Sequence, residues 1–197
     1  MIKVIDYGMG NLGSVAKALA YLGVPAEITD DAAQVAQASQ LVLPGVGAMD
    51  YAIRQLRERR LDQAIAEYLQ TGRPFLGICL GMQLMFERSE EGHVEGLGLL
   101  PGIVRRFPDM PGLKVPHMGW NRLQDSRLPI LSDGTSFYFV HSYYVDPADP
   151  SLTAARSTHG IPFAAAVQKN QILLTQFHPE KSGEAGLELL RQWAVTT

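Results

Sequence analysis

One apolar run constrains the fold of this 197-residue chain more than any other feature: Phe75-Leu76-Gly77-Ile78-Cys79-Leu80-Gly81-Met82-Gln83. It holds the only cysteine, Cys79, with a glycine two residues to either side. Such spacing is typical of a buried strand that turns sharply into a helix, because side chains at the two glycines would collide with the crossing backbone. The N–H groups and dipole of that helix would favour a thiolate. We therefore predict a nucleophilic cysteine; the alternative is a small apolar core residue.

A nucleophilic cysteine that attacks an acyl group needs a base, and the base needs a group to orient it. Only His178 has a carboxylate placed to do this, in the segment 171–180, Gln-Ile-Leu-Leu-Thr-Gln-Phe-His-Pro-Glu. The pattern predicts an apolar strand that ends at His178, after which Pro179 breaks the ladder and Glu180 projects to the same side. We predict a triad of Cys79, His178 and Glu180; the alternative is a local His-Glu pair without a catalytic purpose.

A third element is a short apolar strand that opens into a glycine loop, Leu41-Val42-Leu43-Pro44-Gly45-Val46-Gly47. Glycines let backbone N–H groups approach a substrate closely, as an oxyanion hole requires. We expect donors near Val46 or Gly47, and a second donor at the amide of Leu80. The glycines would also permit a peptide flip that makes or breaks the hole. The alternative is an ordinary strand-to-helix turn.

The segment Gly8-Met9-Gly10-Asn11-Leu12-Gly13 matches the G-x-G-x-x-G fingerprint of dinucleotide-binding proteins. It follows a predicted strand, precedes a predicted helix, and has Asp30 and Asp31 about where a ribose-binding acid would lie. Asp6, however, lies two residues before the first glycine, where its charge would repel a pyrophosphate. We therefore do not expect a dinucleotide site there.

The composition fits a single enzyme domain over residues 1–197. A hydrophobic fraction of 46% supports one buried core, and no linker or charge block divides the chain. A net charge of −3 offers no basic field for nucleic acid, and one cysteine fits a reducing cytoplasm. We expect no membrane partner and no signal peptide, because no apolar run approaches the length of a span and the chain begins in a strand. No histidine has the spacing of a metal ligand, so we predict no metal site.

The predicted elements alternate in the first half of the chain and are mainly strands in the second. Strands are expected at 2–6 and 41–43, and helices where apolar residues share a face, namely Val15, Ala18, Leu19 and Leu22, then Met49, Ile53 and Leu56. The second helix carries Arg54, Arg57, Arg59 and Arg60 on a face that we expect to be solvated. Later strands are expected at 137–140, 153–156, 164–168 and 172–177, with a closing helix from about 184 to 194. This pattern predicts an α/β fold of three layers: a mostly parallel sheet, helices on both faces, and the site at the carboxyl ends of the strands.

These motifs resemble a known family. The runs at 77–83 (Gly-Ile-Cys-Leu-Gly-Met-Gln), 178–180 (His-Pro-Glu) and 44–47 (Pro-Gly-Val-Gly) are similar to those of the class I (triad) glutamine amidotransferases. More narrowly, three runs resemble the glutaminase subunits of imidazole glycerol phosphate synthases, from histidine biosynthesis: 7–15 (Tyr-Gly-Met-Gly-Asn-Leu-Gly-Ser-Val), 116–121 (Pro-His-Met-Gly-Trp-Asn) and 139–143 (Phe-Val-His-Ser-Tyr). The resemblance extends from the first strand to Lys181, and no triad position departs from it.

The resemblance implies hydrolysis of L-glutamine without a cofactor, and passage of the ammonia to a (β/α)8-barrel cyclase subunit in a heterodimer. The substrate contacts that it implies come from Gly45, Gly47, Gln83, Glu91, Ser142 and Tyr143, with Glu91 toward the α-ammonium. The interface residues that it implies are Asn11, Trp120, Tyr138 and Lys181. Two alternatives remain: a glutaminase that serves another acceptor, which has no reason to carry the run at 116–121, and a binding module that keeps only the fold and would tolerate loss of Cys79.

Overall fold

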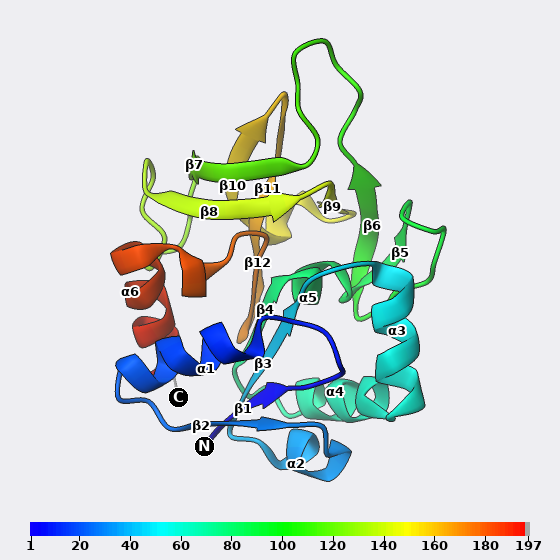
Figure 1. Ribbon diagram of the computed structural model, residues 1–197, viewed down its shortest axis with the longest axis vertical. Coiled ribbons are helices and arrows are strands. Elements are labelled where there is room, and N and C mark those ends of the chain that lie inside the picture. The colour runs from blue at the N-terminus through cyan, green and yellow to red at the C-terminus, as the bar shows by residue number, and fades with distance from the viewer. Residues whose placement is uncertain (196–197) are drawn as a thin grey trace.

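Figure 1 shows the computed structural model of the chain, which describes residues 1–195. The helices are α1 (Leu12–Tyr21), α2 (Ala32–Gln37), α3 (Met49–Glu58), α4 (Leu61–Gln70), α5 (Leu80–Gln83) and α6 (Gly183–Ala194), with short 3-10 helices η1 (Pro150–Leu152) and η2 (Pro179–Lys181). The strands are β1 (Ile2–Ile5), β2 (Ala26–Thr29), β3 (Gln40–Gly45), β4 (Phe75–Cys79), β5 (Phe86–Ser89), β6 (Leu100–Arg106), β7 (His117–Arg122), β8 (Ser136–His141), β9 (Tyr143–Pro147), β10 (Thr153–His159), β11 (Ile161–Lys169) and β12 (Ile172–Thr175).

A seven-stranded sheet forms the centre of the molecule, with strand order β10-β11-β12-β4-β3-β1-β2. The five strands from β12 to β2 are parallel, and β11 and β10 add an antiparallel edge. The predicted α/β class and mostly parallel sheet are therefore confirmed. The antiparallel edge does not follow from the repeated β-α pattern.

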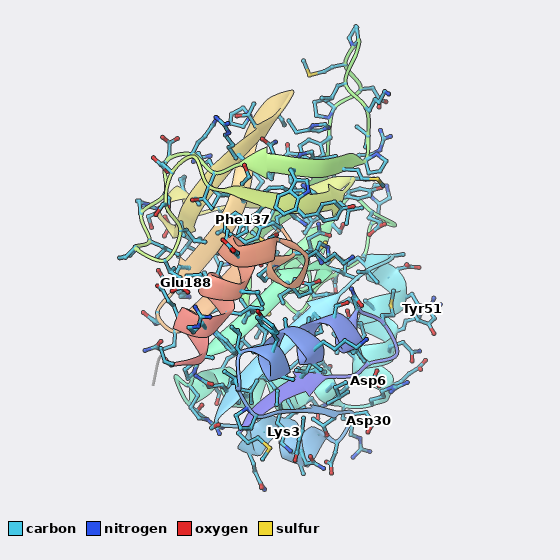
Figure 2. The ribbon with its side chains drawn as sticks, turned by 60° about the vertical axis from the view of Figure 1, so that its left-hand side comes forward. Lys3, Asp6, Asp30, Tyr51, Phe137 and Glu188 are labelled. Carbon is cyan, nitrogen blue, oxygen red and sulfur yellow. The ribbon has the colours of Figure 1, made fainter. Side chains whose placement is uncertain are left out.

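Alternate residues of the parallel strands face opposite sides of the sheet, and each side packs against its own helices. Ile5 and Leu43 belong to one core cluster, which also contains the apolar faces of α3 and α4. Val4 and Val42 belong to the other, together with residues of α1 and α6. Figure 2 shows α1 and α6 next to each other over this second face. Because both faces are covered, the parallel strands read as nearly continuous apolar runs in the sequence.

The two predicted helices of the first half are present, and local chemistry explains their ends. Helix α1 stops where Gly23 takes a positive φ of 72°, a backbone conformation that glycine adopts without strain. Helix α3 buries Ile53 and Leu56, while the four arginines predicted to be solvated, Arg54, Arg57, Arg59 and Arg60, are all exposed. Their exposure is thus confirmed, but the prediction that one helix carries all four is wrong, because α3 ends at Glu58 and Arg60 is the N-cap of α4.

Two smaller sheets cover the carboxyl ends of the central strands. Strands β5, β6 and β9 form one, and β7 and β8 form the other, which crosses above the central sheet in Figure 1. The strand predicted at 137–140 is present in β8, but it pairs with β7 and not with the central sheet. The strand predicted to run to Phe177 ends at Thr175. Phe177 is buried not by strand pairing but by the stacking of its ring on that of Phe137 in β8.

None of the helices within residues 1–195 is long and apolar enough to cross a membrane.

Candidate active site

Cys79 lies at a sharp bend between β4 and α5, as its flanking glycines predict. Strand β4 is buried along its whole length between β3 and β12, and Cys79 is both its last residue and the N-cap of α5. Its φ of 54° and ψ of −107° are strained for a residue with a side chain. A Cβ on Gly81 would overlap the carbonyl oxygen of Leu43, and one on Gly77 would lie 2.7 Å from Leu174 Cδ2. The glycines therefore permit the close packing that holds the cysteine in this conformation.

His178 and Glu180 form a buried pair near this bend. The His178 Nδ1 is 2.8 Å from Glu180 Oε1, and both side chains are only 1% exposed. The prediction that they meet along an extended strand is wrong: His178 is the N-cap of η2, and Glu180 lies inside that 3-10 turn. The turn forms because Pro179 cannot continue the ladder, and it brings the carboxylate back to the ring.

The β7–β8 sheet and the start of α6 hold His178 in place through its backbone. The His178 amide donates to the carbonyl oxygen of Tyr138 at 2.9 Å. Ser182 Oγ donates to the His178 carbonyl at 2.6 Å and accepts from the Tyr138 amide at 2.9 Å. The ring is thus fixed by contacts from β8 that lie far from it in sequence.

The electrostatic environment of His178 favours the imidazolium. Burial by itself lowers its pKa, but the Cys79 sulfur and then the Glu180 carboxylate outweigh burial, and the net effect raises the pKa of His178. Its buried Nε2 has no hydrogen-bond partner at normal distance among the described residues, and the neighbouring Cys79 sulfur is the largest influence that favours the charged ring. The arrangement therefore suits a thiolate–imidazolium pair, in which Nε2 holds a proton ready for transfer.

The sulfur has two further polar neighbours. Cys79 Sγ is 3.9 Å from the carbonyl oxygen of Val140, and Gln176 Nε2 donates to it at 3.6 Å. Gln176 is completely buried. Sequence reasoning missed it as a site residue, although a glutamine inside the apolar run 172–177 is a signal that could have revealed it.

The glycine loop after β3 lies beside the same bend. Gly45 pairs with Cys79 in the sheet register, Val46 is 37% exposed, and Gly47 has a φ of 94° that favours glycine. The Tyr7 hydroxyl packs so closely on Gly45 that a Cβ there would overlap it. This hydroxyl is buried without a hydrogen-bond partner among the described residues, and burial, with Cys79 nearby, raises the pKa of Tyr7 above its usual range.

A cavity of about 360 Å³ opens onto the sulfur. Its lining brings together eight predicted site residues, namely Cys79, Val46, Gly47, Leu80, Gln83, Glu91, Ser142 and Tyr143. The predicted residues Gly45, His178 and Glu180 are not among the lining residues, and sequence reasoning missed Pro116, Val140 and His141, which complete the lining. A larger and more open cleft of about 920 Å³, beside β5 and β6, is lined by no cysteine or histidine and is not the candidate site.

Gln83 and Glu91 line the cavity and also form hydrogen bonds to the backbone around it. Gln83 Nε2 donates to the Tyr143 carbonyl at 2.9 Å, and Glu91 Oε2 accepts from the Met49 amide at 2.9 Å. The Glu91 carboxylate therefore caps the N-terminus of α3 while it supplies negative charge to the cavity. That charge would suit a cationic group of a ligand.

Two buried histidines form a hydrogen-bonded pair at the cavity, which His141 lines. His117 Nδ1 is 3.0 Å from His141 Nε2, and His141 Nδ1 is 2.7 Å from the carbonyl oxygen of Tyr143. Burial lowers the pKa of His117 to about 4 and that of His141 to about 3. Both rings are therefore neutral near pH 7.

This pair predicts a loss of stability in mild acid. Unfolded histidines titrate near pH 6.5, so stability due to the neutral rings is present above that pH and is lost as the pH falls toward 4. Between pH 6 and pH 5, the free energy of unfolding should fall by about 1.4 kcal/mol per pH unit for each ring. Urea denaturation across this range measures the slope, and His93→Gln, at an exposed histidine, should retain it. Ring NMR signals of His117 and His141 that titrate near pH 6.5 would contradict the prediction.

The predicted interface residues come from β7, β8, η2 and the start of α1, and none of them is among the residues that line the cavity. Trp120 is 60% exposed, and its ring meets that of Tyr138 edge-on at 6.3 Å. Lys181 is exposed in η2, and Asn11 is half-buried at the start of α1. Met118, also exposed, extends the apolar surface of β7.

In the loop after β1, which resembles a dinucleotide-binding fingerprint, a backbone amide is occupied by a hydrogen bond within the loop. The Asp6 carboxylate accepts a hydrogen bond from the Gly8 amide at 2.8 Å, so this amide does not face outward for a phosphate. Asp6, which directly follows the last residue of β1, is labelled in Figure 2. Within residues 1–195, no cluster of three or more histidine, cysteine or acidic side chains could hold a metal ion.

The sequence matches a known class of protein. Residues 3–196 match the family described as "Glutamine amidotransferase class-I", and the chain belongs to that family.

The chain is also similar to relatives that bear a more specific name. The imidazole glycerol phosphate synthase subunit HisH of Gloeothece citriformis is 50% identical over 196 residues, which cover 96% of this chain and 93% of that protein. The subunit of the same name from Syntrophotalea carbinolica is 52% identical over 203 residues and 98% of each chain. A crystal structure of a glutamine amidotransferase has a TM-score of 0.77 over 98% of each chain at 19% identity, which indicates a shared fold.

Proposed function

We propose that this chain is the glutaminase subunit of an imidazole glycerol phosphate synthase. It hydrolyses L-glutamine to glutamate and ammonia, and it passes the ammonia to a partner cyclase in histidine biosynthesis. The observation that carries the proposal is the strained Cys79 beside the buried His178–Glu180 pair, in a chain about half identical to the two HisH subunits. A lone free cysteine suits a reducing compartment, and we place the protein in the cytoplasm.

Catalysis begins when the Cys79 thiolate attacks the side-chain amide carbon of glutamine. The His178 imidazolium gives its Nε2 proton to the departing nitrogen, which leaves as ammonia, while Glu180 keeps the ring oriented. Water then attacks the γ-glutamyl thioester. His178 takes the water proton, and glutamate leaves as the thiolate is regenerated.

The negative charge on the amide oxygen needs donors in the attack and in the hydrolysis. We expect the amide of Leu80, at the start of α5, and an amide from Val46 or Gly47 to donate to it, because all three residues line the cavity. The positive φ of Gly47 marks a peptide that can rotate at low cost, so we expect the loop to complete the hole only in the complex with the partner.

The cavity suits an amino acid with a polar side chain. Glu91 is the candidate partner of the α-ammonium, and Gln83 is placed along its wall. Backbone groups of Gly45, Gly47, Ser142 and Tyr143 are proposed to complete the substrate contacts. The side chain of glutamine would then extend along the cavity and bring its amide carbon to the sulfur.

The partner that we propose is a (β/α)8-barrel cyclase in a heterodimer, docked over Asn11, Trp120, Tyr138 and Lys181. Free ammonia is protonated and diluted in water, so release directly into a second active site is the useful outcome. The cyclase would combine it with a phosphorylated ribulosyl intermediate to give imidazole glycerol phosphate and an aminoimidazole carboxamide ribotide.

Glutamate release from glutamine tests this function directly. We expect low turnover by the purified chain alone, and turnover on the order of 10- to 100-fold higher with a barrel cyclase and its nucleotide ligand. Cys79→Ala serves as the control for contaminating glutaminases. Full turnover without the partner would contradict the switch, and no turnover in either state would contradict the function and favour a binding module or a different partner.

A further inference from the structure

The thiolate at Cys79 needs stabilisation that its helix cannot supply. The sequence predicts that the dipole of the following helix favours the charged sulfur. Helix α5, however, has only four residues, and a single turn carries a small dipole. Cys79 is only 6% exposed, so water in the cavity has little access to the charge. The His178 imidazolium supplies an opposite charge, and a hydrogen-bond donor from elsewhere in the fold would stabilise the buried anion further.

Gln176 is that donor. Its Nε2 lies 3.6 Å from Cys79 Sγ, and the residue is completely buried. Its backbone is held as well, because its amide donates to the Ala165 carbonyl at 2.8 Å. The side chain therefore reaches the sulfur from the segment just after β12, on a backbone fixed by β11.

The orientation of the Gln176 amide is set by Gln83. Gln83 Nε2 donates one hydrogen to the Tyr143 carbonyl and the other to Gln176 Oε1, at 2.9 and 3.0 Å. Because the Gln176 oxygen faces a donor, its NH₂ group must face the sulfur. Gln83 therefore orients the side-chain N–H of Gln176 toward the Cys79 sulfur.

A second hydrogen-bond chain, which starts in β7, ends on the same Tyr143 carbonyl, so this oxygen accepts from both Gln83 and His141. Asn121 Nδ2 lies 2.9 Å from the Thr158 carbonyl and 3.2 Å from His117 Nε2, so the amide donates to both. His117 must then carry its proton on Nδ1 and donate to His141 Nε2, and His141 must donate from Nδ1 to the Tyr143 carbonyl. Every tautomer in the chain from Asn121 to Tyr143 is thereby determined.

We propose that Gln176 is a further catalytic residue, which stabilises the Cys79 thiolate through its side-chain N–H, and that Gln83 is a positioning residue that orients it. This inference rests on the proposed function, since only a nucleophilic sulfur needs to be charged. Its test, however, requires neither glutamine nor a partner subunit.

Alkylation of the sulfur as a function of pH tests the inference. The full-length chain has one cysteine, so modification by iodoacetamide reports on Cys79 alone and can be followed by intact mass. In Gln176→Met, which keeps the length of the side chain and removes its N–H, we expect the midpoint of the pH–rate profile to move up by about one unit. At any pH well below the midpoint of the unmodified chain, the alkylation rate should fall about tenfold.

Two further variants separate a chemical role from a structural one. Gln176→Glu keeps an oxygen for Gln83 to donate to but replaces the NH₂ with a second oxygen, so its midpoint should move further up than that of the methionine variant. Gln83→Met, which releases the Gln176 amide, should give a smaller shift in the same direction. Gln168→Met makes the same change at an exposed glutamine of β11 and should match the unmodified chain.

Superimposable profiles for folded Gln176→Met and the unmodified chain would overturn the inference. If that variant does not fold, an unchanged profile in Gln83→Met or Gln176→Glu would overturn it equally. A shifted midpoint in a chain that never hydrolyses glutamine with any cyclase would uphold the inference and contradict the proposed function instead.

Discussion

Replacement of Cys79 by alanine is expected to reduce glutamate release by roughly 10⁴-fold or more. In the proposed mechanism the thiolate forms the bond to the substrate carbon, and neither His178 nor the proposed oxyanion donors can replace it. Water in the cavity would have to attack the amide directly, without the thioester that divides the reaction into two easier steps. The measurement is single-turnover glutamate release in the complex with the cyclase. Residual activity within about tenfold of the unmodified chain would contradict a nucleophilic role.

Cys79→Gly provides the matched control for this change. Both variants lack the sulfur, but only glycine adopts φ 54° and ψ −107° without strain. The glycine variant should therefore be more stable than the alanine variant by about 1 kcal/mol, with equal loss of activity. Urea denaturation of the two variants measures the difference. Equal stability would mean that the bend stores no strain.

Gly81→Ala is expected to disrupt the fold around the site, with a loss of stability above about 4 kcal/mol. The new Cβ would overlap the carbonyl oxygen of Leu43, which belongs to the backbone of β3 and cannot rotate away. Strand β3 or helix α5 would have to move, and both contribute to the cavity. Thermal unfolding and the yield of folded protein measure the effect.

Gly13→Ala makes the same chemical change where there is room for it. Gly13 lies in the first turn of α1 and is exposed, and a methyl group on its Cα would meet no atom of a described residue within 4 Å. Alanine there should stabilise the isolated chain by about 0.5–1 kcal/mol, because it restricts the unfolded backbone and favours a helix. A Gly81→Ala variant as stable as Gly13→Ala would contradict the role assigned to close packing at the bend.

The parts of the site with a local signal could be predicted from the sequence. The bend at Cys79 depends on glycines two residues away, and the His178–Glu180 pair spans three residues. The alternation of strands and helices also follows from short-range periodicity, which is why the α/β class is confirmed. In each case, the residues that determine the structure lie next to one another in the chain.

The parts that depend on distant contacts could not be predicted. Gln176 meets Cys79 and Gln83 across 97 and 93 positions, and no local pattern records such a pairing. The apolar run that ends at Phe177 reads as one strand, because periodicity does not distinguish a paired strand from a segment buried by ring stacking. For a similar reason, the sequence does not predict which sheet β8 joins. Its pairing with β7 leaves no signal in the local sequence of either strand.

The position of β12 in the central sheet also has a consequence for the order of events during synthesis. Strand β4 is flanked by β3 and β12, and β12 is the last of the described strands to leave the ribosome. Pairings between strands so distant in sequence form late, because the loop between them must be closed first. A nascent chain that has already exposed Cys79 therefore lacks both the neighbouring strand and the histidine that follows it. Glutamine hydrolysis cannot begin until translation is nearly complete, so unfinished chains waste no glutamine.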